Sequence, residues 1–454
     1  MEVHAGLRML PHDFSLVAPS GGRVRVVKRS RGGRERKTHR RKRRWGTIAW
    51  HTTHLHDLEI VRILILTQSY PPVLGGLQTV THVLASRLQA RGHSVLVVTN
   101  HYPRALARYE KREGVELRRW LFLHPPADYV SSKRLDLLLA SCWYFPRTLN
   151  RLRALISHFG PDVVNLQFPD TLVPYVLKLG ESRTFRLVVS LHGDEVERWR
   201  RAEPGVSRAR TRFRRILQEC DAVTACSRYL LDRATDLEPS VPSKGRVIHN
   251  GIDARRFATS DSCNSERRYI LLLGRLTRKK GIDLLLDAFA RLADRSDLDL
   301  VVAGEGEEEP TLREQARLLQ IADRVRFFGR ASATEVVSLL RGAQFLVVPS
   351  REEPFGIVAL EALAAGTPVL VTSVGGLPEL VDATSRDDRA SPDEEPSEDA
   401  SIQIVEPTVD AIGRGLANWY AHPPAPLDES RRKHILSSFD WGIVVTGYEE
   451  VYGV

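Results

Sequence analysis

The stretch Val61-Arg-Ile-Leu-Ile-Leu-Thr-Gln-Ser-Tyr-Pro-Pro-Val-Leu-Gly-Gly76 contains the structural unit that the rest of the chain repeats. Its first seven residues are almost all apolar, which is typical of a parallel strand buried on both faces. A loop rich in Pro and Gly follows. Beyond it, apolar residues recur at helical spacing, at Val80, Val83, Leu84 and Leu88. The stretch therefore predicts a strand, a loop and a helix in succession.

The same alternation continues to the C-terminal part of the chain and divides into two halves. We expect further strands in the first half at 94–99, 163–166, 187–191, 222–225 and 247–248. In the second half we expect them at 269–273, 298–303, 325–328, 345–348 and 369–372. Alternating strands and helices with short connections predict parallel sheets with right-handed crossovers. We therefore predict an α/β fold with two Rossmann-like, doubly wound domains. Their ligands would bind beyond the carboxyl ends of the strands, in the cleft between the domains.

Composition is that of a soluble globular protein. The chain has 454 residues, of which 42% are hydrophobic and 27% charged. We find no apolar run near the ~18 residues of a spanning helix, and no secretory signal. The four cysteines, Cys142, Cys220, Cys226 and Cys263, form no C-x-x-C pair and have no zinc spacing. We expect Cys220 and Cys226 to be buried, and the protein to be cytoplasmic.

Positive charge is concentrated at the N-terminus. Residues 1–60 contain 14 Lys/Arg and 5 Asp/Glu, whereas the rest of the chain contains 52 and 51. We interpret residues 1–60 as a basic, disordered extension. The alternatives are a nucleic-acid arm or a metal-binding patch around His51, His54 and His56. A third alternative is that the natural protein starts at Val61 and lacks this segment. A near-neutral body argues against a nucleic-acid partner.

The most informative stretch for a binding site is Ser350-Arg-Glu-Glu-Pro-Phe-Gly-Ile-Val-Ala-Leu-Glu361. The proline after Glu353 holds that residue extended, and a helix is expected to begin near Gly356. The helix N-terminus would present the N–H groups of residues 355–358 to an anion or a sugar hydroxyl. A carboxylate at such a place is often only a cap. Glu361, however, lies too deep to cap an otherwise apolar helix, so we predict hydroxyl recognition.

Two glycine-containing loops are candidate phosphate sites. Gly75-Gly76 would let backbone N–H groups approach an anion at a helix N-terminus, although a tight turn explains the pair equally well. In Gly274-Arg-Leu-Thr-Arg-Lys-Lys-Gly281, Arg275 and Lys280 follow a strand and suit a diphosphate. A solvated basic loop is the alternative, because no Walker pattern is present.

Three further motifs are better explained structurally when they are taken alone. His192 follows a strand beside a glycine, a position that is more often structural than catalytic. Gly304-Glu-Gly306 lacks the third glycine of a dinucleotide fingerprint and is interpreted as a strand-end turn. Asp297-Leu-Asp299 is interpreted as polar flanks of a strand. We expect no metal site.

Taken in order, these motifs resemble those of the family 4 retaining glycosyltransferases, which have the GT-B fold. The resemblance covers residues 61–454. The motifs that carry it are Tyr70-Pro-Pro with Gly75-Gly76, His192-Gly, Asn250-Gly-Ile-Asp253 with Phe257, Gly274-Arg275 with Lys280-Gly281, Glu353 with Glu361, Val374-Gly-Gly-Leu-Pro-Glu379, and Phe439-Asp-Trp441.

The resemblance implies a domain organisation. Residues 61–258 would form the N-terminal, acceptor-side domain, and residues 259–437 the nucleotide-sugar-binding domain. Residues 438–454 would cross back and pack on the first domain. The family usually has a Gly-containing loop soon after the Gly-Gly-Leu-Pro-Glu motif. Here an acidic insertion at 382–399 replaces that loop, which bears on base or acceptor selectivity.

The resemblance also implies roles for single residues. Arg275 and Lys280 would hold the donor diphosphate, Glu361 the ribose hydroxyls and Glu353 the transferred sugar, with His192 beside that sugar. The main chain near Arg330 would meet the nucleobase. The catalytic set would be His192, Arg275, Lys280 and Glu353. The donor-binding set would be Gly75, Gly76, Arg330, Phe355, Gly356, Ile357, Val358 and Glu361.

The activity implied is transfer of a hexosyl unit from a nucleoside-diphosphate sugar to a glycan, glycolipid or small-molecule hydroxyl, with retention and without a metal or other cofactor. Fixed cations at the diphosphate would stabilise the leaving group electrostatically. The alternatives are a nucleotide-sugar epimerase on the same scaffold and nucleic-acid binding through the basic tail. The sugar, the base and the acceptor stay undefined.

A membrane surface is a further candidate partner. Residues 198–215 contain eight arginines and Trp199. On a helix, Arg208, Arg212 and Arg215 would share one face. Such a face would be attracted to anionic lipid at the inner side of a membrane, or it would simply be solvated.

Overall fold

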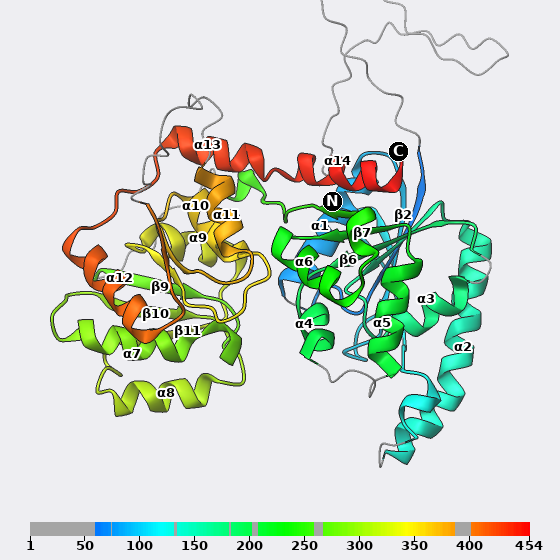
Figure 1. Cartoon of the computed structure of the whole chain (residues 1–454), viewed down its shortest axis with the longest axis horizontal. Helices are drawn as coiled ribbons and strands as arrows, with labels where there is room; N and C mark the ends of the chain where they lie inside the picture. The colour runs from blue at the N-terminus through cyan, green and yellow to red at the C-terminus, as the bar shows by residue number, and fades with distance from the viewer. Residues whose placement is uncertain are drawn as a thin grey trace, which may run out of the picture. The chain divides into compact units, whose positions relative to one another are not determined.

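The computed structural model describes residues 60–73, 75–130, 134–180, 183–201, 208–257, 267–385 and 401–454. The predictions for residues 1–59 lie outside the described residues, as does Cys263. The described residues contain two predominantly parallel sheets flanked by helices, so the predicted α/β class with two doubly wound sheets is confirmed (Figure 1).

The first sheet has eight strands. Their spatial order is β3 (Tyr109–Arg112), β4 (Val115–Trp120), β2 (Ser94–Asn100), β1 (Arg62–Thr67), β5 (Val163–Gln167), β6 (Arg186–Leu191), β7 (Ala222–Ala225) and β8 (Gly245–Val247). All neighbours are parallel except β3 and β4. The helices between them are α1 (Gly76–Ala90), α2 (Leu135–Phe159), α3 (Val173–Leu179), α4 (Asp194–Arg201), α5 (Arg208–Glu219) and α6 (Arg228–Leu237).

The second sheet has six parallel strands. Their spatial order is β11 (Val325–Gly329), β10 (Asp299–Ala303), β9 (Tyr269–Leu273), β12 (Leu346–Val348), β13 (Val369–Thr372) and β14 (Ile402–Val405). The accompanying helices are α7 (Ile282–Ala293), α8 (Glu309–Leu318), α9 (Ala333–Gly342), α10 (Ile357–Ala365), α11 (Leu377–Ser385), α12 (Val409–Ala421) and α13 (Glu429–Ser438).

Chain order reverses beside the first strand of each sheet. In the first sheet β2 and β5 lie on opposite sides of β1, and in the second sheet β10 and β12 lie on opposite sides of β9. The two loops that leave such a point diverge to opposite faces, which leaves room for a ligand at the carboxyl ends of the strands. The topology therefore draws attention to the loops after β1, β9 and β12.

One predicted boundary is wrong. Asp382–Ser385 were expected to begin the acidic loop, but α11 continues through Ser385. The helix continues because its apolar positions Leu377 and Leu380 are buried and Val381 packs beside them. The rest of the acidic segment, residues 386–399, lies outside the described residues.

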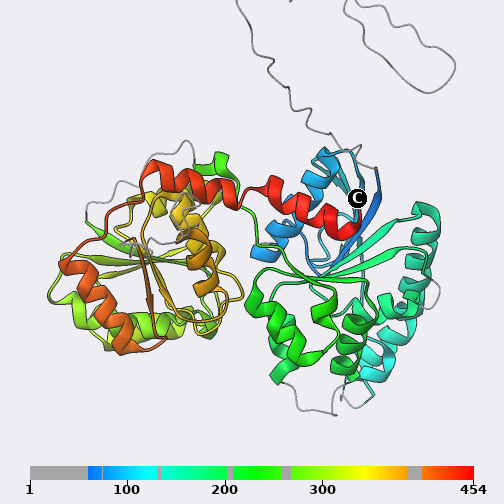
Figure 2. The same cartoon turned by 45° about the horizontal axis from the view of Figure 1, so that its top comes forward.

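The C-terminal helix packs against the first sheet. α13 contacts α10, whereas α14 (Trp441–Tyr452) contacts α1 (Figures 1 and 2). The apolar side of α14 shares a buried cluster with β1 and α1. The buried carboxylate of Glu449 lies 3.0 Å from Nε2 of His93, and Asn165 Nδ2 donates to Tyr452 Oη over 2.8 Å. Polar contacts thus fix the register of α14 on the sheet.

Candidate functional site

A cation and a carboxylate meet at the reversal point of the second sheet. Lys280 follows β9 and Glu353 follows β12. Lys280 Nζ donates to Glu353 Oε2 over 2.6 Å, and the Glu353 side chain is only 8% exposed. Gly281 brings the two loops together: its φ is +66°, and a Cβ there would lie 2.0 Å from the carbonyl oxygen of Pro349. Only glycine permits this approach.

The loop after β10 supports the loop after β9. A Cβ on Gly304 would lie 1.8 Å from the carbonyl oxygen of Gly274, and one on Gly306 would lie 2.2 Å from that of Leu276. Both glycines are therefore required by close backbone packing. The interpretation of Gly304-Glu-Gly306 as a strand-end turn agrees with this geometry.

α10 begins at the predicted place. Gly356 is its N-cap with φ +102°, and the helix runs from Ile357 to Ala365. The N–H groups of its first turn, including those of Ile357 and Val358, have no acceptor within the helix. They are therefore the groups that a bound anion or hydroxyl could use at this place.

Glu361 has a partner that the sequence did not reveal. Arg256, in the short helix η4 (Ala254–Phe257), donates from Nη1 to Glu361 Oε1 over 3.0 Å. Burial raises the pKa of Glu361, and Arg256 partly offsets that rise. The pair joins two segments far apart in the chain, so no local motif could have shown it.

His192 ends a buried hydrogen-bonded chain in the first domain. Asn165 donates to Tyr452, so its Oδ1 accepts from Gln167 Nε2 over 2.9 Å. This orients Gln167 Oε1 toward His192 Nε2, 2.6 Å away, and assigns the proton to Nε2. Burial lowers the pKa of His192 to about 4, so the imidazole is neutral at pH 7.

Glu195 stabilises the turn after His192. Its carboxylate accepts the N–H groups of His192 and Gly193, the second over 3.0 Å. Burial raises the pKa of Glu195 to about 7, against the lowering effect of these hydrogen bonds. The turn that presents His192 thus depends on a fully buried acid.

Loops of the first domain contact the loop after β12. A Cβ on Gly193 would lie 2.2 Å from Cγ of Pro354. Ser227 donates from Oγ to the carbonyl oxygen of Pro354 over 2.6 Å. A Cβ on Gly76 would lie 3.4 Å from Cδ1 of Ile357. The predicted residues of the first domain therefore lie next to those around α10.

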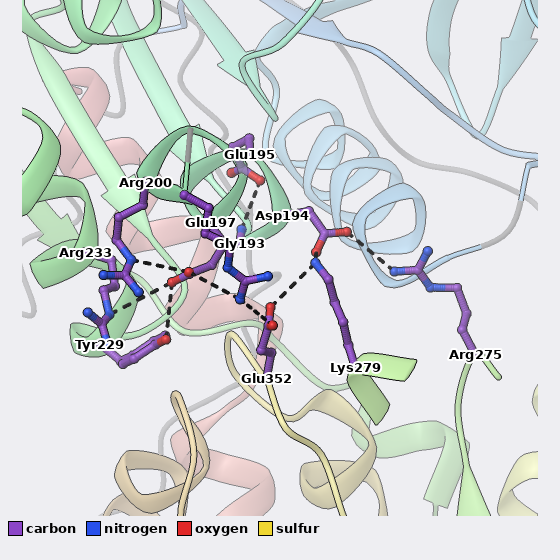
Figure 3. A network of polar contacts seen from close by, with 11 residues as sticks. Gly193, Asp194, Glu195, Glu197, Arg200, Tyr229, Arg233, Arg275, Lys279 and Glu352 are labelled. Atoms are coloured by element: carbon purple, nitrogen blue, oxygen red, sulfur yellow. Dashed lines mark hydrogen bonds and ion pairs between the residues drawn. The ribbon is translucent and has the colours of Figure 1, made fainter. Parts of the chain in front are cut away.

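A network of ion pairs also joins these loops (Figure 3). Asp194 accepts from Lys279 Nζ over 2.9 Å, and its other oxygen lies 3.7 Å from Arg275. Lys279 also lies 3.6 Å from Glu352, which pairs with Arg201 of α4. Burial would raise the pKa of Asp194, but Lys279, Arg275 and Arg198 outweigh it and leave that pKa below its ordinary value. One predicted donor cation, Arg275, thus already faces a carboxylate.

The remaining predicted residues lie at other ends of strands and helices. Gly75 precedes α1, and a Cβ there would meet its own neighbour Gln78 at 2.2 Å. Arg330 is exposed after β11, two strand positions from β9. Asp299 pairs with Arg324 over 2.8 Å, which agrees with its interpretation as a strand flank. Cys220 and Cys226 are buried as expected.

The arginines of α5 are engaged within the protein. Arg208 donates to the carbonyl oxygen of Ala127 over 2.6 Å, Arg212 pairs with Asp128, and Arg215 donates to Glu219 over 2.6 Å. Residues 202–207 lie outside the described part. None of the helices in the described part combines the length and the hydropathy of a membrane span. Nor do these residues contain a group of three or more His, Cys, Asp or Glu side chains suited to a metal ion.

Two Rossmann-like domains whose strand-end loops meet, with a C-terminal helix that returns to the first domain, define the GT-B class. Residues 74–256 match the model of glycosyltransferase family 4, and residues 256–395 match that of glycosyl transferases group 1. Glycogen synthase from Mycobacterium tuberculosis is 30% identical over 424 residues, covering 86% of this chain and 94% of that protein. The chain belongs to the family 4 glycosyltransferases, so the predicted family and enzyme class are confirmed.

Solved structures agree in fold. Sucrose-phosphate synthase from Thermosynechococcus elongatus superposes with a TM-score of 0.67 at 21% identity, covering 87% of this chain and 98% of that one. HepE from Anabaena, solved in complex with UDP, gives a TM-score of 0.63 at 18% identity over 86% and 99% of the two chains. At these identities the likeness concerns the fold.

Proposed function

We propose that this glycosyltransferase moves a hexosyl unit from a nucleoside-diphosphate sugar to a hydroxyl acceptor, with retention of configuration and without a metal. The observation that carries the proposal is the Lys280–Glu353 pair at the reversal point of the second sheet, with Arg275 in the same loop. The HepE structure holds UDP, which supports a nucleotide donor for a chain of the same fold.

The cations would act on the leaving group. Lys280 and Arg275 would face the donor diphosphate, on which negative charge grows as the bond to the anomeric carbon breaks. A preorganised cation stabilises that charge more than the bound ground state. These two residues could do so without a metal ion, which is the basis for proposing a metal-independent reaction.

The sugar and the nucleoside would lie on either side of the diphosphate. Glu353 and the main chain of residues 355–357 would hold the transferred sugar, with Gly76 approaching the phosphates from the first domain. Glu361, oriented by Arg256, would accept the ribose hydroxyls. The main chain at Arg330 would meet the nucleobase. These groups lie in loops at the carboxyl ends of strands, in α10 or at the start of α1.

His192 would orient the sugar as a neutral side chain. Its Nε2–H is donated to Gln167, so Nδ1 would accept a hydrogen bond from a sugar hydroxyl. For retention, the acceptor oxygen would attack on the face from which the diphosphate leaves. The bond between the anomeric carbon and the diphosphate oxygen breaks, the bond to the acceptor oxygen forms, and the acceptor proton passes to the diphosphate.

A donor screen tests the proposal. UDP-, GDP- and ADP-hexoses are offered with glycan, glycolipid and small hydroxyl acceptors, with and without EDTA, and the product anomer is assigned by NMR. We expect transfer from one nucleotide class, an anomer that matches the donor, and no loss with EDTA. An inverted anomer, a requirement for added Mg²⁺ or Mn²⁺, or an epimerised sugar formed from donor alone would each contradict it.

A further inference from the structure

The N-terminal half of α2 exposes an apolar stripe. Leu139 is 71% exposed and Trp143 is 58% exposed, and Leu135 and Tyr144 are also exposed. Leu135, Leu139 and Trp143 are spaced by four residues, so they lie on one side of the helix. We call Leu135, Leu139, Trp143 and Tyr144 the α2 stripe. Large apolar side chains gathered in this way mark a binding surface more often than single exposed ones do.

The opposite side of the same turns is held by the domain. Ser141 Oγ donates to the carbonyl oxygen of His124 over 2.5 Å, and Phe145 stacks on Tyr175 with ring centroids 4.4 Å apart. The stripe therefore belongs to a helix that is fixed in place. In the view of Figure 1 this end of α2, drawn in cyan, extends beyond α3 and α5.

Arginines outnumber acidic residues on α2 and on α5, the helix that is joined to it through η1. α2 contains three arginines and one aspartate, and that aspartate pairs with Arg134 over 2.7 Å. The guanidinium of Arg147 lies 3.2 Å from the centroid of the Trp143 ring. α5, with five arginines and one glutamate, is joined to η1 (Pro126–Asp128) by its pairs with Ala127 and Asp128, and η1 packs on α2.

We propose that the α2 stripe docks on the interface of an anionic lipid bilayer. Leucine and tryptophan would enter the boundary between headgroups and acyl chains, and the arginines would remain among the anionic headgroups. A second copy of this chain fits less well, because a two-fold contact through this face would bring the arginine-rich helices of both copies together. The inference does not depend on the identity of the donor or the acceptor.

Vesicle flotation of the full chain tests the proposal. The vesicles are phosphatidylcholine alone or phosphatidylcholine with roughly one third phosphatidylglycerol. Leu139→Glu and Trp143→Glu should each lower binding to the anionic vesicles about tenfold or more, since each removes one apolar side chain that would enter the bilayer. Leu318→Glu on α8, where the side chain is 67% exposed, is the matched control and should bind like the parent.

All of these variants keep the basic residues 1–60, so a difference in lipid binding between them reports on the α2 stripe. If all three bind equally, the tail or other charges bind the lipid and the proposal is wrong. If Trp143→Glu instead turns a dimer into a monomer in light scattering and leaves lipid binding unchanged, a second copy is the occupant and the proposal is also wrong.

A probe on Cys142 reports insertion directly. Cys142 is exposed beside Trp143, and Cys220 and Cys226 are buried. Cys263→Ser removes the fourth thiol of the chain. An environment-sensitive fluorophore on Cys142 should brighten on anionic vesicles and be quenched by spin labels carried on the lipid chains. An unchanged probe on vesicles that bind the protein would overturn the proposal. Transfer to a water-soluble acceptor should be the same for Trp143→Glu and the parent, so failure here is distinguishable from failure of the proposed reaction.

Discussion

Replacing Lys280 by alanine should affect stability and transfer separately. From the sequence, Lys280 is a loop cation whose loss should leave the fold unchanged. In the structure its ammonium lies 2.6 Å from Glu353, and the two side chains are 25% and 8% exposed. Lys280→Ala leaves a nearly buried carboxylate without this partner. Exposed pairs contribute about 0–1 kcal/mol, and breaking a buried pair costs about 3–5 kcal/mol. We expect a loss of about 2 kcal/mol.

That loss corresponds to a fall in Tm of roughly 5 °C for domains of this size. Transfer should fall by about 10²–10³, because one preorganised charge on the leaving diphosphate is missing. The double variant Lys280→Ala/Glu353→Gln removes the unpaired charge and should recover about half of the lost stability. It should recover none of the transfer rate, because the cation is still absent.

The measurements are initial rates with the preferred donor, and thermal and urea unfolding of the four proteins in this cycle. Near-normal transfer by Lys280→Ala would refute the assignment of this loop to the donor. Recovery of transfer together with stability in the double variant would show that Lys280 acts only by holding Glu353. An unchanged Tm would contradict the structural pair itself.

Three other perturbations probe the network, the buried acid and the loop contact. Asp194→Asn should tighten nucleoside-diphosphate binding several-fold at low salt, because the carboxylate no longer competes for the loop cations. The gain in affinity, measured by calorimetry, should shrink as salt is added. An unchanged Kd would contradict this. The pKa of Glu195 is raised to about 7, so the folded state holds this proton more tightly than the unfolded chain. The stability of the parent relative to Glu195→Gln should therefore fall as pH rises from about 4.5 to 7, measured by urea unfolding; a rise over that range would mean that the pKa is depressed. Gly281→Ala should lower the free energy of unfolding by more than about 2 kcal/mol, because the new Cβ would meet the Pro349 carbonyl. Gly453 also has a positive φ but lies in open space, so Gly453→Ala should cost about 1 kcal/mol. Equal losses would rule out the contact.

Secondary structure was largely predictable because it depends on local patterns. Buried parallel strands are continuous apolar runs, so β1, β9 and β13 could be located within a residue. β3 could not be located, because Tyr-Glu-Lys-Arg is a polar edge strand stabilised only by its antiparallel pairing with β4. β14 was also missed, because Gln403 interrupts its apolar residues and the strand follows directly on the acidic segment.

Local patterns were enough to identify the chemical groups that end the strands: the cations after β9, the carboxylates around α10 and the histidine after β6. Strand ends meet at one edge of a parallel sheet, so their candidate roles could be inferred without coordinates. Which side chains pair with one another became clear only from the coordinates. Arg256 with Glu361, Asp194 with Lys279, and Asn165 with Tyr452 join segments 105, 85 and 287 residues apart. Such pairs depend on how sheets and helices pack, and packing at that distance leaves no signal in local spacing.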